Sequence, residues 1–172
     1  MQRNLSRSLG LAIGLLLLVG ITGCSSGPSN WTFTDAEGDL RTMSDYTGGV
    51  VVLAFTNSWC DSCHHAALHL QDLQQRFADQ GVRVVYVSSW EHGDPVAYLE
   101  EHGYTYGLML NGTRIAQEYK VDVIPTFCVL GSNGQLVGKI EGFNRGTPAR
   151  LSGTIQRHLR KKDMRTASHN DG

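Results

Sequence analysis

VVVLAFTNSWCDSC, residues 50–63, joins an apolar run to two cysteines three positions apart. The run from Val50 to Phe55 is apolar throughout, which is typical of a central strand covered on both faces. From about Ser62 to Asp79 the apolar residues recur at helical spacing and predict a helix. The members of that stripe are Ala66, Leu70, Leu73 and Phe77. The stretch therefore predicts a buried strand that leads into a helix through the cysteine pair.

Cys60 falls at the start of the predicted helix, and Cys63 follows one turn later. Unpaired backbone N–H groups and the positive end of the helix dipole favour a thiolate at a helix N-terminus. Cys60 is therefore the predicted nucleophile, and Cys63 is close enough to resolve a mixed disulfide. The pair predicts reversible thiol-disulfide chemistry.

A CxxC pair can instead supply half of a structural zinc site, which needs two further ligands. The chain has four cysteines. Cys24 lies in the leader described next, and Cys128 stands alone on a predicted strand, where an unpaired cysteine packs as a small apolar residue. No second CxxC completes a site, so redox chemistry is favoured over structural zinc.

The N-terminus predicts export. Arg3 and Arg7 precede an apolar run from Leu9 to Val19, which suits the central region of a signal peptide and is short for a membrane span. Ile21-Thr22-Gly23-Cys24 resembles a bacterial lipobox, which implies cleavage after residue 23 and acylation of Cys24, for example with palmitate. We therefore expect a lipoprotein signal peptide at 1–23 and a lipidated tether at 24–30. An ordinary secretory signal and an uncleaved anchor remain alternatives, and both also export the domain.

The remainder predicts one α/β domain at 31–160, followed by a polar C-terminal tail at 161–172. Without residues 1–23 the chain keeps 149 of its 172 residues, enough for a full core, and the loss of two arginines changes the formal charge from −1 to −3. Nothing in this balance points to nucleic acid.

Turn and capping signals predict further strands at 31–34, 40–43, 82–88, 126–130 and 136–141, and helices at 94–103, 113–119 and 147–159.

Residues 31–160 resemble exported, membrane-tethered thioredoxin-fold proteins of the TlpA/ResA type. The resemblance rests on the Trp59-Cys60 start of the WCxxC motif, on an N-terminal hairpin, and on an insertion between Ser88 and Val121. It implies an α/β thioredoxin fold with that hairpin and a helix/strand insertion before a cis-proline loop. Residues 123–127, Val-Ile-Pro-Thr-Phe, match that loop.

The same resemblance implies a substrate-binding surface beside the cysteines. Ile124 and Pro125 are expected to offer backbone groups to an incoming polypeptide, with a cis bond between them, and Thr126 belongs to the same loop. Trp59 is expected to cover the Cys60 sulfur and shape substrate approach; its other interpretation is shielding of the core edge.

The sequence departs from the family pattern at three positions. Leu68 stands where a proline usually kinks the active-site helix, His64 stands where a basic residue follows the second cysteine, and Ala54 replaces the buried acid of cytoplasmic thioredoxins. Proton transfer from Cys63 must then use water, Asp61 or His64.

The residues around the cysteines also bear on redox poise. Asp61, in the Asp61-Ser62 pair between the cysteines, disfavours a second negative charge on the attacking sulfur and so favours a reductant over an oxidant. The helix dipole and His64 act in the opposite direction. We predict a disulfide reductase, with an oxidase or isomerase as the competing direction, and expect no cofactor or metal.

Two other functions use similar residues. With Cys60 and Cys63, a histidine among His64, His65 and His69 could form a Cu(I) site of the kind used by Sco-type copper-delivery proteins. Those proteins usually have three residues between the cysteines, and His65 and His69 also fit a plain solvent-facing helix stripe. A peroxiredoxin-like peroxidase needs a threonine three positions before its reactive cysteine, and Asn57 stands there.

The expected setting is the cell envelope, with the protein anchored to a bacterial membrane and facing the periplasm or extracytoplasmic space. Its expected partners are exported proteins with disulfides, for example in cytochrome c maturation, and a membrane electron donor that restores the dithiol. Ser25 stands where an aspartate would favour inner-membrane retention, and the choice of membrane stays open.

Overall fold

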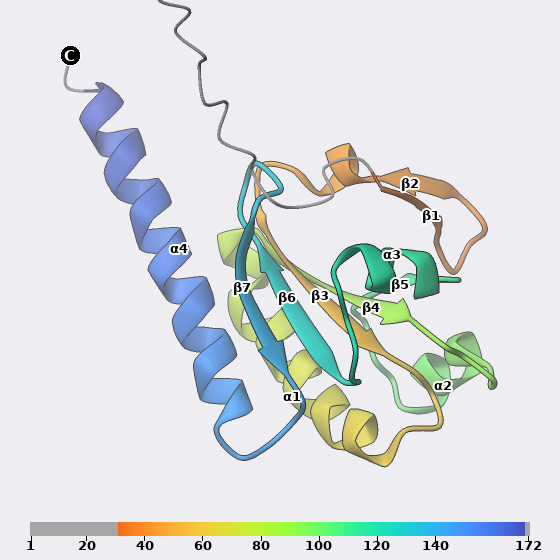
Figure 1. Cartoon of the computed structure of the whole chain (residues 1–172). Helices are drawn as coiled ribbons and strands as arrows, with labels where there is room; N and C mark the ends of the chain where they lie inside the picture. The colour runs from red at the N-terminus through yellow and green to blue at the C-terminus, as the bar shows by residue number, and fades with distance from the viewer. Residues whose placement is uncertain (1–30, 171–172) are drawn as a thin grey trace, which may run out of the picture.

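The computed structural model describes residues 31–170, and the predicted signal peptide, Cys24 and the tether lie outside this range. Its centre is a five-stranded sheet of order β5-β4-β3-β6-β7 (Figure 1). Strands β3, β4 and β5 are parallel, and β6 and β7 run antiparallel to their neighbours. The strands are β3 Val50–Thr56, β4 Val82–Ser88, β5 Gly107–Met109, β6 Thr126–Leu130 and β7 Leu136–Glu141.

Strand β3 is buried along its whole length, as its apolar run predicts. Alternate side chains enter two different cores, because successive residues of a strand point to opposite faces. Val52 packs with α1 (Asp61–Phe77), α2 (Pro95–Glu101) and α4 (Thr147–Asn170), whereas Leu53 packs with α3 (Thr113–Glu118) and the N-terminal hairpin. Figure 1 shows α3 and the hairpin across the sheet from α1. The predicted thioredoxin-like α/β fold is confirmed.

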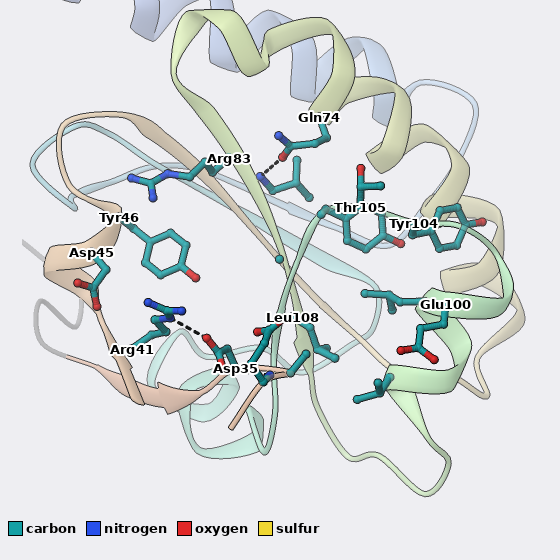
Figure 2. Close-up of a pocket in the computed structure, with 17 residues that line it drawn as sticks. Asp35, Arg41, Asp45, Tyr46, Gln74, Arg83, Glu100, Tyr104, Thr105 and Leu108 are labelled. Carbon is teal, nitrogen blue, oxygen red and sulfur yellow. Dashed lines mark hydrogen bonds and ion pairs between the residues drawn. The ribbon is translucent and has the colours of Figure 1, made fainter. Parts of the chain in front are cut away.

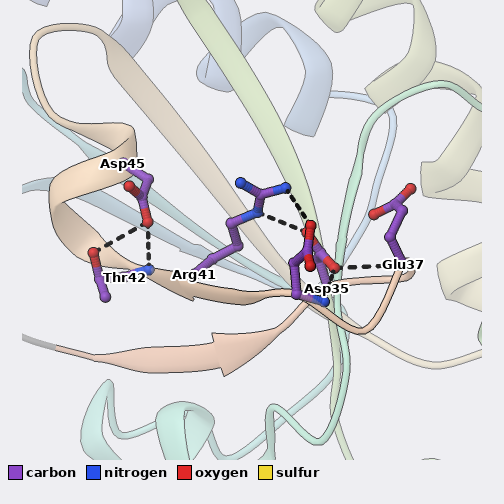
Figure 3. A network of polar contacts seen from close by, with 6 residues as sticks. Asp35, Glu37, Arg41, Thr42 and Asp45 are labelled. Carbon is purple, nitrogen blue, oxygen red and sulfur yellow. Dashed lines mark hydrogen bonds and ion pairs between the residues drawn. The ribbon is translucent and has the colours of Figure 1, made fainter.

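The N-terminal hairpin consists of β1 Thr32–Thr34 and β2 Leu40–Thr42, followed by the 3-10 helix η1 Met43–Tyr46. Asp35 organises its turn, because its carboxylate accepts hydrogen bonds from the backbone N–H groups of Glu37 and Asp39 and from Arg41 Nε at 2.7 Å (Figure 3). Burial acts to raise the pKa of Asp35, but these hydrogen bonds and the charge of Arg41 together hold that pKa below its usual value.

The predicted insertion is present between β4 and β6. Helix α2 begins as expected, with Pro95 at its first position and Asp94 accepting from the N–H groups of Val96 and Ala97. Strand β5 adds the edge of the sheet, and Thr34 of the hairpin bridges to Leu110 just beyond it. The insertion therefore links the hairpin to the sheet edge.

Helix α4 is longer than predicted. The sequence pattern predicts an end near Leu159 and a polar tail at 161–172, whereas the helix continues to Asn170. The segment after Leu159 contains no glycine or proline before Gly172, so nothing in its local sequence stops the helix. Within the described residues, no helix has the length and apolar character needed to cross a bilayer.

Candidate active site

The two cysteines of the CxxC motif differ in exposure. A short loop after β3 leads to Cys60, which is the N-cap residue of α1 with φ −97° and ψ 115°. Its carbonyl accepts hydrogen bonds from Cys63 N–H at 2.9 Å and His64 N–H at 3.1 Å. Cys60 is partly exposed, whereas Cys63 is 3% exposed. This confirms the predicted placement of Cys60 at the helix start, with the second thiol beneath the surface.

Cys63 is held as a neutral thiol. Burial and a hydrogen bond with Cys60 raise its pKa to about 12, against smaller opposing effects of hydrogen bonds from the Thr56 hydroxyl and the Asn57 backbone. A thiol with such a pKa stays protonated at neutral pH. The arrangement therefore separates an accessible sulfur from a protonated partner one helical turn away.

The Pro125 loop lies beside the loop that carries Cys60. Phe55 of β3 pairs with Thr126 of β6, so the segment before Thr126 adjoins the segment after Phe55. The Ile124-Pro125 bond is cis, as the family resemblance implies. Thr126 Oγ1 donates to the Val123 carbonyl at 2.7 Å and stiffens the loop from within.

The backbone groups of Ile124 and Pro125 differ in their partners within the chain. The Pro125 carbonyl accepts from Gly142 N–H at 2.8 Å, because β7 and its following turn lie against the loop. Ile124 makes no backbone hydrogen bond within the described chain, so its N–H and C=O have no backbone partner there. Val123, next to it, is 50% exposed and adds apolar surface.

Trp59 and His64 are fixed by neighbouring groups. Trp59 is 53% exposed, and its Nε1–H donates to the Trp90 carbonyl at 3.2 Å. His64 Nε2 lies 2.8 Å from the Ser58 carbonyl, and its ring stacks on Tyr98 with centroids 5.0 Å apart. His64 therefore contacts the loop before Cys60.

The other predicted tuning residues lie at the surface. Ser62 Oγ is 3.2 Å from Cys60 Sγ, within hydrogen-bond range for sulfur. Asp61 is exposed at the first position of α1. Leu68 is 67% exposed and sits in an uninterrupted helix, because no proline removes a backbone hydrogen bond there.

Sequence reasoning missed Glu91, which follows β4. Its carboxylate accepts from Ser58 N–H at 3.0 Å and from Ser58 Oγ at 2.7 Å. Because β3 and β4 are parallel with Thr56 opposite Ser88, the residues after both strands meet at one edge of the sheet. A carboxylate just past a parallel strand is the signal that points to such a position.

An aromatic cluster also lies near the cysteines. Tyr86 pairs in register with Ala54, the position of the missing buried acid, and its hydroxyl is buried with no hydrogen-bond partner in the described chain. Burial raises the pKa of Tyr86, and nearby Glu91 and Cys63 raise it further. The rings that stack or tilt against one another here are Tyr86, Tyr98, Tyr104, Tyr106, His64 and His102.

The alternatives find no specific support in this geometry. The described residues contain no group of three or more histidine, cysteine or acidic side chains placed to hold a metal ion, and the ring of His69 packs against Phe143 at 5.4 Å. Asn57 occupies the position of the peroxidase threonine and donates to the Ser89 carbonyl. The neighbouring Thr56 hydroxyl bonds Cys63, not Cys60.

A cavity of about 630 Å³ lies elsewhere, between the hairpin turn, α2 and edge strand β5 (Figure 2). Its walls mix polar and apolar groups, with the Asp35–Arg41 ion pair on one side and Glu100 on another. Neither the cysteines nor the Pro125 loop lines it, so it is separate from the candidate active site.

A thioredoxin-like fold with a CxxC motif at a helix start and a cis-proline loop beside it defines a thiol-disulfide oxidoreductase. Comparison with known proteins agrees. The profile of the AhpC/TSA family matches residues 28–139, and the chain belongs to this family.

Relatives of the chain bear a consistent name. The thiol-disulfide oxidoreductase ResA of Geobacillus kaustophilus is 26% identical over 172 residues, which cover 92% of this chain and 95% of that protein. ResA of Bacillus subtilis is 26% identical over 139 residues, 78% of each chain. These relatives confirm the ResA-type resemblance, and the protein is a thiol-disulfide oxidoreductase.

Solved structures confirm the fold. A DsbE-type thiol:disulfide interchange protein from Chlorobium tepidum superposes with a TM-score of 0.67 at 24% identity, covering 76% of this chain and 93% of that one. StoA from Bacillus subtilis gives a TM-score of 0.61 at 20% identity, covering 75% and 98%.

Proposed function

We propose that the protein is an exported, lipid-anchored disulfide reductase in which Cys60 is the nucleophile and Cys63 the resolving thiol. The observation that carries the proposal is the difference between the two sulfurs. Cys60 is accessible at a helix N-terminus, whereas Cys63 is buried and protonated. Substrate attack at Cys60 and later resolution by Cys63 follow from that difference.

The reaction begins when the Cys60 thiolate attacks one sulfur of a substrate disulfide. A Cys60–substrate disulfide forms, the substrate S–S bond breaks, and the released substrate sulfur takes up a proton. Cys63 then gives up its proton and attacks Cys60 Sγ, which releases the second substrate thiol. The substrate gains two electrons and the protein keeps a Cys60–Cys63 disulfide, which a membrane dithiol donor must reduce.

The substrates in this proposal are exported proteins with disulfides, including apocytochromes c during maturation. An extended substrate strand lies along the Pro125 loop, paired with Ile124 and flanked by Trp59. The names of the ResA relatives support thiol-disulfide exchange. The lipid on Cys24 and the position in the envelope, facing the periplasm or extracytoplasmic space, rest on the sequence of residues 1–30.

Substitution of each cysteine tests the assigned roles. Cys63→Ala removes the resolving thiol, so mixed disulfides between Cys60 and exported proteins should accumulate. Cys60→Ala removes the nucleophile and should trap none, because Cys63 is buried. The measurement is non-reducing electrophoresis of cells quenched with acid, followed by mass spectrometry. Equal trapping by both variants would contradict the assignment.

A redox titration tests the direction of the reaction. Purified protein equilibrated with glutathione buffers should remain largely oxidised until the buffer is strongly reducing, as expected for a reductant. The fraction of free thiol is measured by alkylation and mass. The same titration with one equivalent of Cu(I) tests the copper alternative. Full protection of both cysteines by Cu(I) in the presence of glutathione would favour copper delivery instead.

A further inference from the structure

The carboxylate of Glu91 connects two loops at the sheet edge. Besides its two hydrogen bonds from Ser58, Oε1 accepts from the backbone N–H groups of His92 at 3.1 Å and Gly93 at 3.0 Å. Oε2 also lies 3.4 Å from Ser88 Oγ. Glu91 is thus fixed in its own loop while it binds the residue two positions before Cys60.

Ser58 is held from its other side as well. Its carbonyl is bonded by His64 Nε2 at 2.8 Å, and because a carbonyl only accepts, that nitrogen carries the hydrogen. The N–H, the hydroxyl and the carbonyl of Ser58 therefore all have partners. Glu91 and His64 together fix the backbone that leads into Cys60.

The loop that carries Glu91 is itself closely packed. Trp90 has a left-handed backbone with φ +51°, and its N–H donates to Thr113 Oγ1 at 2.8 Å. Such a conformation persists where surrounding contacts hold it. At Gly93 an added Cβ would lie 2.4 Å from Ser58 Oγ, so the Ser58 hydroxyl could not keep its present position beside a larger residue. Trp59 joins the same contact through its bond to the Trp90 carbonyl.

We propose that Glu91 is a positioning residue for disulfide exchange, which clamps Ser58 so that Cys60 Sγ meets a substrate disulfide along the S–S axis. The proposal rests on the proposed role of Cys60 as nucleophile. Small displacements of a reacting atom lower rates strongly, and the clamp limits such displacements. Glu91 acts through Ser58 and touches no reacting atom.

The test measures glutathionylation of Cys60 by glutathione disulfide in the Cys63→Ala background, by mass, from pH 6 to 10. In this background the mixed disulfide accumulates and reports the first step alone. Glu91→Ala should lower the rate limit reached at high pH about tenfold. If Glu91 acted only through its negative charge, and not through its hydrogen bonds with Ser58, its loss would shift the pH at which the rate rises and leave the rate limit at high pH unchanged.

Gly93→Ala distinguishes the effect of the Ser58–Glu91 hydrogen bonds from the effect of the Glu91 charge. The added Cβ would lie 2.4 Å from Ser58 Oγ, so this hydroxyl must leave its bond to Glu91 Oε1 while the carboxylate remains, and the limiting rate should also fall. Glu101→Gln is the matched control. It removes the same negative charge from an exposed side chain of α2, and that side chain makes no hydrogen bond or ion pair in the described chain. Its limiting rate should equal that of the parent.

Glu91→Gln keeps the inference testable if Glu91→Ala does not fold. The amide retains an acceptor at Oε1 but turns an NH₂ group toward Ser58 N–H, so a smaller loss of limiting rate is expected. Parental limiting rates in both a folded Glu91 variant and Gly93→Ala would overturn the inference. A parent that forms no mixed disulfide at Cys60 would instead refute the proposed function.

Discussion

Buried tyrosine hydroxyls illustrate how a single atom sets local stability. Tyr119 Oη accepts from Trp31 Nε1 at 3.3 Å, whereas the buried Tyr86 hydroxyl has no partner in the described chain. Pairing of buried polar groups decides whether their removal costs free energy. The two residues therefore form a matched pair for one chemical change.

Replacement of each tyrosine by phenylalanine should give opposite results. Tyr86→Phe removes an unpaired buried hydroxyl and should leave the free energy of unfolding unchanged or raise it by up to about 1 kcal/mol. Tyr119→Phe strands the indole N–H of Trp31 and should lower it by about 1–2 kcal/mol. Urea unfolding of the reduced protein measures both. A loss for Tyr86→Phe as large as for Tyr119→Phe would show that the Tyr86 hydroxyl has a partner.

At the scale of elements, the N-terminal hairpin depends on one ionised side chain. Asp35 holds the turn between β1 and β2 and bonds Arg41. Its lowered pKa means that the folded state favours the carboxylate. The resulting stability is present above the unfolded pKa, about 3.9, and is lost as pH falls through the folded pKa.

Asp35→Asn should therefore show a pH-dependent defect. Its melting temperature should lie a few degrees below that of the wild type at pH 5 to 7. The two should begin to converge below about pH 4 and meet only as pH falls through the lowered pKa of Asp35 in the folded state. Thermal unfolding followed by circular dichroism between pH 2.5 and 7 measures this. Asp39→Asn, at a more exposed partner of Arg41, is the control with a smaller defect; a difference for Asp35→Asn that did not change with pH would contradict the role of its charge.

Elements with a long apolar pattern were predictable from the sequence, and contacts between loops were not. Strand β3 is a continuous apolar run and helix α1 carries apolar residues at helical spacing, so their type and approximate limits follow from the pattern. Three-residue β5 was implied only by the family resemblance, since so short a strand has no pattern of its own. The predicted end of α4 near Leu159 is wrong, because polar composition alone does not end a helix that no glycine or proline interrupts.

The residues of the candidate site also differ in whether the sequence alone identifies them. Cys60, Cys63 and the Pro125 loop were found because spacing and family motif mark them in the linear sequence. Glu91 was missed because its importance depends on Ser58, which is distant in sequence and becomes its neighbour only through the parallel pairing of β3 and β4. A register-dependent contact of this kind is invisible until the sheet is assembled.

At the scale of the molecule, one sheet supports two separate surfaces. The cysteines and the Pro125 loop lie where the end of β3 adjoins the start of β6, and the cavity lies against the hairpin and edge strand β5. The aromatic cluster spans part of the region between them, since Tyr104 and Tyr106 also line that cavity. The cluster of stacked aromatic rings therefore lies between the candidate active site and the cavity and contacts both.

Helix α4 ends far from the start of α1, at the upper left and lower right of Figure 1. A fluorophore, a bead or a fused reporter attached at the C-terminal end of α4 would therefore lie away from the two cysteines. Immobilised in that orientation, the protein would present its reactive face to the surrounding solution, which makes the C-terminal end the natural attachment point for a capture column that retrieves trapped substrates.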